Sequence, residues 1–226
     1  MSALLDEGLR HHKTGDMEKA EQCYLDAVAA NSSDAQALKL LAVLQAERGQ
    51  FDDAASYAEA AFNLLPNDGE CAHLFGRIRI ERGEFKAAVP VLRQATQKAS
   101  SNPAVWADFG LCLERTSAWT EAQRAFEKVL ELDSSHRTAT HGLGRVAQAL
   151  GNLELAEKSF KGAADTDAKD AEAWVGLAQV EQQRGNLEAA LKHAEHACSI
   201  APDAAPCTAA REEIRKALDA DADTLG

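Results

Sequence analysis

Few groups of residues in this sequence have the types and the spacing that catalysis or metal binding needs. The run Gly142-Leu143-Gly144-Arg145-Val146-Ala147 fits the loose Gly-x-Gly-x-x-Ala pattern of dinucleotide-binding loops. That pattern requires a preceding strand and a turn that opens a helix, whereas these residues lie inside a predicted helix. His193 and His196 are one helical turn apart, but Cys198 points elsewhere and no third metal ligand is evident. The sequence therefore predicts no metal site and no cofactor.

The cysteines and carboxylates do not indicate an enzyme either. The 5 cysteines form no Cys-x-x-Cys pair, and their odd number and wide spacing favour neither a disulfide framework nor a zinc site. We interpret them as small buried side chains. The carboxylates are spread over amphipathic segments, which is typical of a solvated surface rather than of an acid–base pair. We therefore predict a protein without catalytic activity.

Composition narrows the class of protein further. Hydrophobic residues make up 46% of the 226 residues and aromatics only 5%, so Ala, Leu and Val must form the core, which favours helices. The formal net charge of −12 argues against a dedicated nucleic-acid binder. No apolar run approaches the roughly 20 residues that span a bilayer, and residues 1–7 do not resemble a signal peptide. We expect a soluble, cytoplasmic protein with no membrane insertion.

A period of 34 residues runs through most of the chain. Glycines recur at 34 residues or twice that spacing, with Ser117 at the one missing position: Gly15, Gly49, Gly83, Gly151 and Gly185. Alanine occurs five positions after each of these six sites: Ala20, Ala54, Ala88, Ala122, Ala156 and Ala190. A small residue occurs seven positions before each site: Gly8, Ala42, Gly76, Gly110, Gly144 and Ala178. The chain therefore contains six repeats, at residues 1–34, 35–68, 69–102, 103–136, 137–170 and 171–204.

Each repeat has the pattern of two helices that are separated at the glycine position, where a positive φ is tolerated. The small residues allow the two helices to approach closely. Trp106 and Trp174 hold the same large-residue position in their repeats, so we interpret them as packing residues. One further amphipathic segment, 205–219, reads as a capping helix that covers the last repeat, and 220–226 reads as a frayed acidic tail.

This arrangement resembles the tetratricopeptide repeat. The family pattern of a Trp or Leu, Leu-Gly, Ala, an aromatic, Ala and Pro is matched by the fourth repeat with Trp106, Phe109-Gly110, Ala122 and Phe126. The family's Tyr is replaced in every repeat, and its closing Pro is retained only as Pro66 and Pro202. The resemblance implies an all-α fold: residues 1–219 would form one α-solenoid, a right-handed superhelix whose concave wall consists of the first helix of each pair.

The resemblance also places the fifth and ninth residues of each repeat on that concave wall. These residues are Leu5, Leu9, Lys39, Val43, His73, Arg77, Ala107, Leu111, His141, Arg145, Val175 and Gln179, and none of them is acidic. The functional hypothesis is a groove for an acidic and apolar peptide, with partner-binding residues Lys39, Val43, His73, Arg77, Leu111, His141 and Arg145. The alternative is a solvated face whose positive charge is diluted by Glu47, Glu70, Asp108 and Glu114. The Lys and Asn clamp by which some family members grip a chaperone tail is not reproduced.

We accordingly predict a non-catalytic adaptor or scaffold that binds another protein. A structural protein that assembles with itself is the first alternative, because Leu4, Leu5 and Leu9 of the uncapped first repeat would expose an apolar patch. The second alternative is a relative of the repeat arms that position substrates for larger enzymes such as glycosyltransferases.

Overall fold

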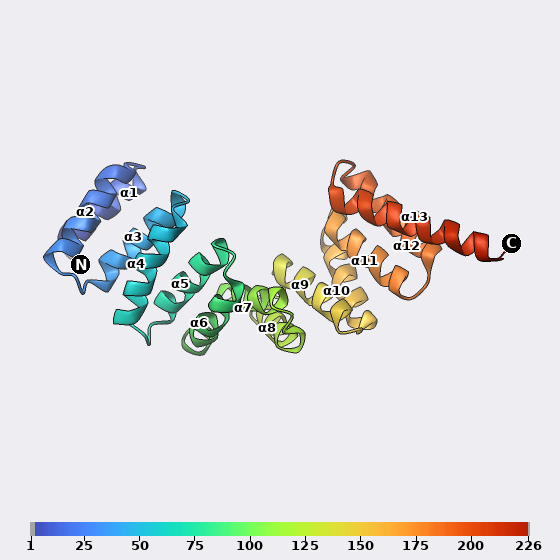
Figure 1. Ribbon diagram of the computed structural model, residues 1–226, viewed down its shortest axis with the longest axis horizontal. Helices are drawn as coiled ribbons and strands as arrows, with labels where there is room; N and C mark the ends of the chain where they lie inside the picture. Colours follow the sequence, from blue (N-terminus) through green and yellow to red (C-terminus); the bar gives the residue numbers. More distant parts are fainter. Residues whose placement is uncertain (1–2, 226) are drawn as a thin grey trace. The chain divides into compact units, whose positions relative to one another are not determined.

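The computed structural model describes residues 3–225, and the side chains of residues 3–220. Every regular element within that range is an α-helix, thirteen in all (Figure 1). The helices are α1 (Ala3–Lys13), α2 (Met17–Ala30), α3 (Ala35–Glu47), α4 (Phe51–Leu64), α5 (Gly69–Glu81), α6 (Phe85–Lys98), α7 (Pro103–Arg115), α8 (Trp119–Leu132), α9 (Arg137–Ala149), α10 (Leu153–Thr166), α11 (Ala171–Gln183), α12 (Leu187–Ile200) and α13 (Ala205–Leu225). Two helices per 34-residue repeat and one further helix confirm the predicted all-α repeat fold.

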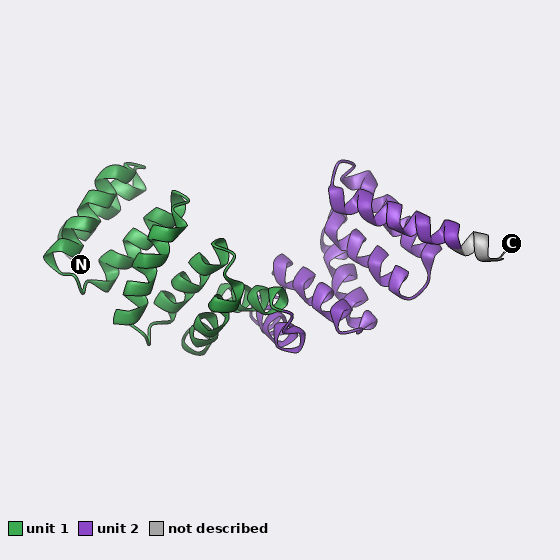
Figure 2. Ribbon diagram, viewed as in Figure 1, with its two compact units in different colours: residues 1–116 green, residues 117–226 purple. Residues whose placement is uncertain are grey.

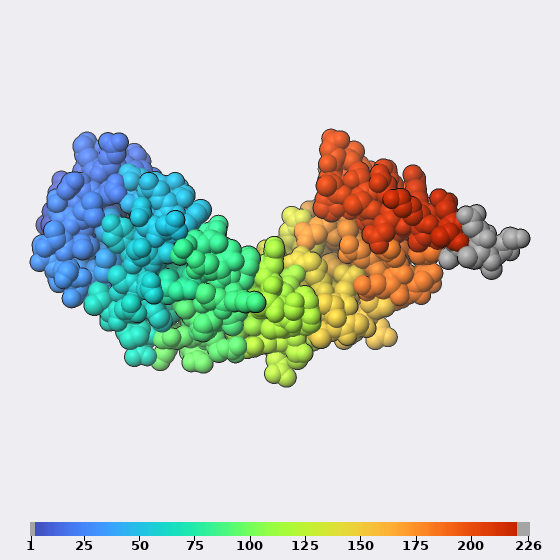
Figure 3. All heavy atoms as spheres, in the orientation of Figure 1, coloured from blue at the N-terminus to red at the C-terminus, as the bar shows by residue number. Residues whose placement is uncertain are grey.

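The helices form two compact units, residues 1–116 with α1–α7 and residues 117–226 with α8–α13 (Figure 2). Within each unit, every helix packs against the next one along the chain, and first helices of neighbouring repeats also touch, as in α3 with α5 and α9 with α11. The sequence-ordered colours of each unit follow one another in bands for the same reason (Figure 3). Each unit is therefore a stretch of α-solenoid, in which every repeat buries its apolar face against its neighbours.

The turn between the two helices of each repeat has the predicted left-handed conformation. All five glycines at this position have φ between 73° and 81°, and Ser117 takes the same place with φ 60°. Glycine adopts this conformation without the steric penalty that a Cβ atom brings. The sequence signal at 34-residue spacing thus marks a backbone requirement.

The small residues on the first helices are matched to the side chains that face them. A Cβ atom at Gly76 would lie 2.5 Å from a Leu92 methyl group, and one at Gly144 would lie 2.6 Å from the Phe160 ring. Where the first helix carries alanine at this position, as at Ala42, the second helix also carries alanine, as at Ala58. Glycine is therefore used where a large side chain fills the crossing, and alanine where both residues are small.

The N-termini of the first helices are capped by a second periodic column, at the last residue of each repeat. The side chains of Asp34, Asp68, Asn102 and Asp170 accept hydrogen bonds from backbone N–H groups of α3, α5, α7 and α11. His136 does the same for α9 through Nδ1. These caps satisfy donors that the first helical turn leaves free.

The two ends of the chain differ from the sequence-based expectation. Leu5 is only 1% exposed, and Leu4 and Leu9 are partly buried, so the expected apolar patch at the first repeat is not formed. At the other end, Cys207, Ala210 and Ile214 of α13 are buried against α11 and α12. The helix continues to Leu225, beyond the predicted end at 219. The predicted fraying of 220–226 concerns a segment whose side chains, from residue 221 on, lie outside the described part.

Candidate functional site

In unit 1, the predicted groove residues lie on the first helices, and their positive charges have partners on the next first helix. Lys39 on α3 donates through Nζ to Glu70 of α5 at 2.9 Å. His73 on α5 bonds Asp108 of α7 at 2.7 Å, and the Nε of Arg77 lies 3.9 Å from the same carboxylate. Val43 and Leu111 are half-buried. The nearby carboxylates named as the alternative thus balance part of the positive charge.

The same arrangement recurs in unit 2. Arg145 on α9 donates through Nη1 to Glu172 of α11 at 2.8 Å. His141 lies four residues earlier on α9, and its side chain is only 3% exposed. Its Nε2 bonds Asp170 at 2.8 Å. A cation on one first helix and a carboxylate on the next therefore link neighbouring repeats, with acidic residues that stand outside the two predicted columns.

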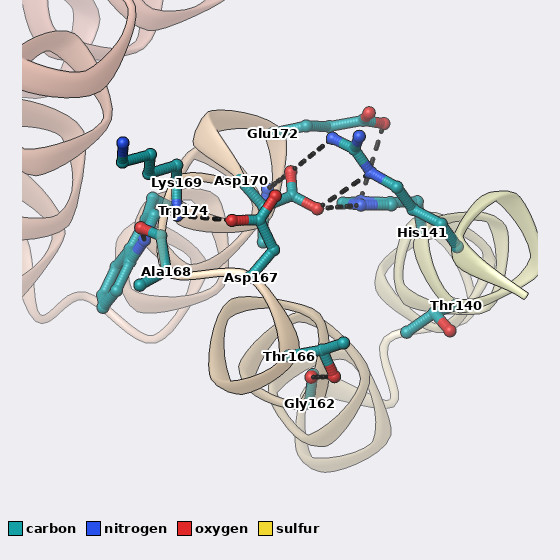
Figure 4. A network of polar contacts seen from close by, with 12 residues as sticks. Thr140, His141, Gly162, Thr166, Asp167, Ala168, Lys169, Asp170, Glu172 and Trp174 are labelled. Carbon is teal, nitrogen blue, oxygen red and sulfur yellow. Dashed lines mark hydrogen bonds and ion pairs between the residues drawn. The ribbon is translucent and has the colours of Figure 1, made fainter. Parts of the chain in front are cut away.

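Asp170 is the centre of a polar network that joins α9 to α11 (Figure 4). It is 2% exposed and accepts a two-pronged contact from Arg137, at 3.1 Å from Nε and 3.0 Å from Nη2. It also bonds His141 and the backbone N–H of Ala173. Burial by itself raises the pKa of Asp170, but the hydrogen bonds from His141, Arg137 and Ala173 outweigh it and hold the pKa below its ordinary value. Asp170 is therefore ionised at neutral pH and holds α9 and α11 together.

Three adjoining hollows lie along α9, α11 and α13, and we call them together the inner groove. The first, of about 310 Å³, is lined by Arg137, Thr138, His141, Arg145 and Glu172. The second, of about 360 Å³, shares Arg145 and Glu172 with the first and includes Phe160, Val175, Gly176, Gln179, Pro206 and Cys207. The third, of about 600 Å³, shares Gln179 and Pro206 with the second and includes Gln148, Gln182, Gln183 and Glu213. The inner groove therefore changes from charged, through largely apolar, to amide-lined.

The charged end of the inner groove offers hydrogen-bond donors for an anionic group. Among the described residues, the buried Nδ1 of His141 has no hydrogen-bond partner, and it lies 3.7 Å from Glu172 Oε1. The Arg145 side chain is partly exposed, and its contact Glu172 is exposed as well. A ligand carboxylate that replaced Glu172 would meet the Arg145 guanidinium and this imidazole nitrogen.

Sequence reasoning placed Arg145, Val175 and Gln179 on this wall but missed three components. Arg137, Asp170 and the glutamines beyond Gln179 lie outside the fifth and ninth positions of the repeat. The N-cap column that ends in Asp170 is visible in the sequence at a spacing of 34, and it is the signal that could have located the network.

The other chemistry-bearing residues have packing roles. His193 and His196 lie against the Trp174 ring, with ring centroids at 5.5 Å and 4.4 Å. Burial, followed by the charge of Asp108, raises the pKa of the Cys112 thiol to about 12, so this cysteine is not a thiolate at neutral pH. In the described part of the chain, no three His, Cys, Asp or Glu residues are grouped so that they could hold a metal ion. None of the described helices combines the length and the apolar character that crossing a membrane requires.

Comparison with known proteins gives matches along most of the chain. Two tetratricopeptide repeat profiles match residues 5–68 and 45–109, and the profile of the cilia and flagella-associated protein 70 middle TPR-like domain matches residues 81–201. The general transcriptional corepressors trfA of Dictyostelium discoideum and ssn6 of Schizosaccharomyces pombe are 24% and 26% identical over 128 and 120 residues, or 56% and 52% of this chain. The matched segments make up only 9% and 11% of those proteins.

Among solved structures, the fold is similar to that of YrrB, described as a TPR protein with an unusual peptide-binding site. The TM-score is 0.74 at 20% identity, over 84% of this chain and 97% of YrrB. A tetratricopeptide repeat protein from Parabacteroides merdae has a TM-score of 0.76 at 18% identity, over 95% and 85% of the two chains.

Proposed function

The chain belongs to the tetratricopeptide repeat family, and from this membership we propose that it is a non-catalytic adaptor that binds an extended segment of a partner protein. The inner groove of unit 2 is the proposed binding site. Its continuity from Arg145 through Val175 to the glutamines is the observation that carries the proposal.

The chemistry of the inner groove favours a segment with a carboxylate followed by an apolar side chain. The carboxylate would exchange places with Glu172 on Arg145, and the apolar side chain would contact Val175, Phe160 and Cys207. Glutamine amides both donate and accept hydrogen bonds, so they suit the backbone of an extended peptide. The stacked helices hold these side chains in place before binding, which reduces the entropy lost on association.

The predicted residues of unit 1 are a second, weaker proposal. Lys39, His73 and Arg77 share Glu70 and Asp108 as partners, so a ligand carboxylate must compete with residues of the chain itself. Together with Val43 and Leu111, they form a proposed additional contact region for the same partner. The printed descriptions of the relatives, transcriptional corepressors and a peptide-binding repeat protein, support a role in binding other proteins.

The proposal is tested by affinity capture from lysate with mass spectrometry, comparing wild type with Arg145→Glu. We expect Arg145→Glu to lose specific partners, because it reverses the charge that meets the ligand carboxylate. Arg124→Glu is the matched control, since Arg124 is exposed on α8 and lines none of the three hollows. Equal capture by wild type and Arg145→Glu, with both proteins folded, would remove the inner groove as the binding site. The double variant Lys39→Glu and Arg77→Glu tests unit 1 in the same way.

A further inference from the structure

Unit 2 contains a second cavity, of about 540 Å³, outside the inner groove. It lies between α8, α9 and α10 and the segment that leads into α11. Leu130, Leu143 and Leu155 form its apolar walls, and we call it the Thr140 cavity after the residue that explains it. Arg137 lines both the Thr140 cavity and the inner groove.

The Thr140 cavity occupies a place that other repeats fill with tryptophan. Thr140 is the fourth residue of its repeat, and Trp106 and Trp174 are the fourth residues of the repeats before and after it. Each of these indoles donates its N–H to the backbone carbonyl six residues earlier, Trp106 to Ser100 at 2.9 Å and Trp174 to Ala168 at 3.2 Å. The carbonyl at the corresponding place before Thr140 belongs to Ser134, which also lines the cavity.

The residues opposite Thr140 are small as well. Trp174 packs on His193 and His196, and the same positions of the preceding repeat hold Ser159 and Gly162. Both line the Thr140 cavity, and Figure 4 shows Gly162 and Thr140 on separate helices, α10 and α9. A Cβ atom at Gly162 would have no atom within 4 Å. Three small residues thus stand where the next repeat has an indole and two imidazoles.

The polar atoms of these small residues are already satisfied by their own helices. The Thr140 hydroxyl donates to the His136 carbonyl at 3.3 Å, and the Ser159 hydroxyl donates to the Leu155 carbonyl at 2.9 Å. The cavity therefore presents mainly apolar surface, which suits an aromatic ring, together with the Ser134 carbonyl as an acceptor.

Four charged residues line the Thr140 cavity, and their pairing leaves a positive site. Arg137 and Asp170 pair with each other, and Asp167 accepts the backbone N–H of Lys169 at 2.9 Å. Lys158 is exposed and forms no hydrogen bond or ion pair with any described residue. An anionic group beside the ring would complement this ammonium group.

We propose that the Thr140 cavity binds a tryptophan side chain of a partner protein, with an acidic neighbour of that tryptophan at Lys158. The inserted indole takes the place that the repeat's own tryptophan holds elsewhere, and its N–H donates to the Ser134 carbonyl. This surface does not depend on the inner groove, so Arg145→Glu leaves it intact.

The test uses three blocked peptides and amide chemical shifts of the full-length chain. Acetyl-Glu-Trp-Glu-amide is the probe, acetyl-Glu-Ala-Glu-amide lacks the ring, and acetyl-Lys-Trp-Lys-amide reverses the charge. We expect the probe to cause saturable shifts at Thr140, Ser159 and Gly162, the alanine peptide to cause none, and the lysine peptide to bind about tenfold more weakly. No saturable shift with the probe, or equal shifts with the alanine peptide, overturns the proposal. Binding of free indole without binding of the probe also overturns it, because the site would then be one for a small molecule.

Thr140→Trp supplies the missing indole from the chain itself. We expect this variant to melt at a higher temperature than wild type and to lose binding of the probe. Undiminished binding by a folded Thr140→Trp contradicts the proposal. If the variant does not fold, Gly162→Leu fills the same space from α10 and must also abolish binding, whereas Lys158→Glu must weaken the probe and strengthen the lysine peptide.

Discussion

At the scale of single residues, Asp170 combines two roles that are separate in the earlier repeats. Asp34 and Asp68 cap helices, whereas Glu70 and Asp108 pair with cations of the preceding first helix. Asp170 caps α11 and pairs with both Arg137 and His141 while it is almost fully buried. A buried ion pair is strongly destabilised when one partner loses its charge, because the remaining charge is left uncompensated.

Asp170→Asn is expected to destabilise the chain by about 2 kcal/mol at neutral pH. The amide keeps an oxygen for the α11 cap but removes the charge that Arg137 and His141 require. Urea unfolding followed by circular dichroism measures this loss. Asp165→Asn, at an exposed aspartate on α10, is the control and should change stability by less than about 0.5 kcal/mol.

The same substitution predicts a pH dependence. The pKa of Asp170 is lowered from 3.8 in the folded chain, so its ionised form stabilises the fold above that pH. As the pH falls below 3.8, the unfolded chain takes up the proton first and this stabilisation is lost. The stability difference between wild type and Asp170→Asn should therefore shrink in acid. A difference that stays constant from neutral pH to well below 3.8 would argue against the assigned role.

At the scale of helices, the crossing within a repeat is set by a pair of residues rather than by one small residue. Glycine faces a large side chain in the pairs Gly8 with Tyr24, Gly76 with Leu92 and Gly144 with Phe160. Gly142, which has no counterpart in the periodic columns, leaves room for Phe126 in the same way, at 2.5 Å from a built Cβ atom. The shape of each crossing therefore depends on the partner helix, which a single periodic column does not reveal.

Gly76→Ala is expected to destabilise unit 1 by about 1–3 kcal/mol, because the new methyl group overlaps Leu92. Adding Leu92→Ala reproduces the Ala42 and Ala58 pair, so the double variant should be more stable than the sum of the single effects predicts. A double-mutant cycle by urea unfolding measures this coupling. Strict additivity of the two substitutions would show that the pair does not set the crossing.

At the scale of the whole molecule, both ends have buried the apolar residues that a second copy would otherwise cover. Leu5 lies in the first-repeat core with Tyr24, and α13 covers α11 and α12. The large apolar side chains that are exposed, such as Leu65, Leu132 and Leu150, are far apart in the sequence and lie one by one at helix ends. Single exposed leucines do not indicate an oligomer interface.

The chain is therefore expected to be a monomer. Size-exclusion chromatography with light scattering over a wide concentration range measures this directly. A stable dimer would revive self-assembly as a function, and substituting Leu4 and Leu9 by serine would then show whether the first repeat forms the contact.

The sequence by itself determined the number of repeats, their helix pairs and the turn positions, because close helix packing demands small residues and a left-handed turn demands glycine at a constant spacing. It also indicated which first-helix residues share one wall, and Arg145, Val175 and Gln179 line the inner groove. Only the tertiary structure decided which charges on that wall are balanced, since the carboxylates of Glu172 and Asp170 reach across from the next repeat. The Thr140 cavity likewise depends on residues of three helices. A vacant volume exists only where all its neighbours are small, and periodicity along one chain does not record which residues become neighbours in space.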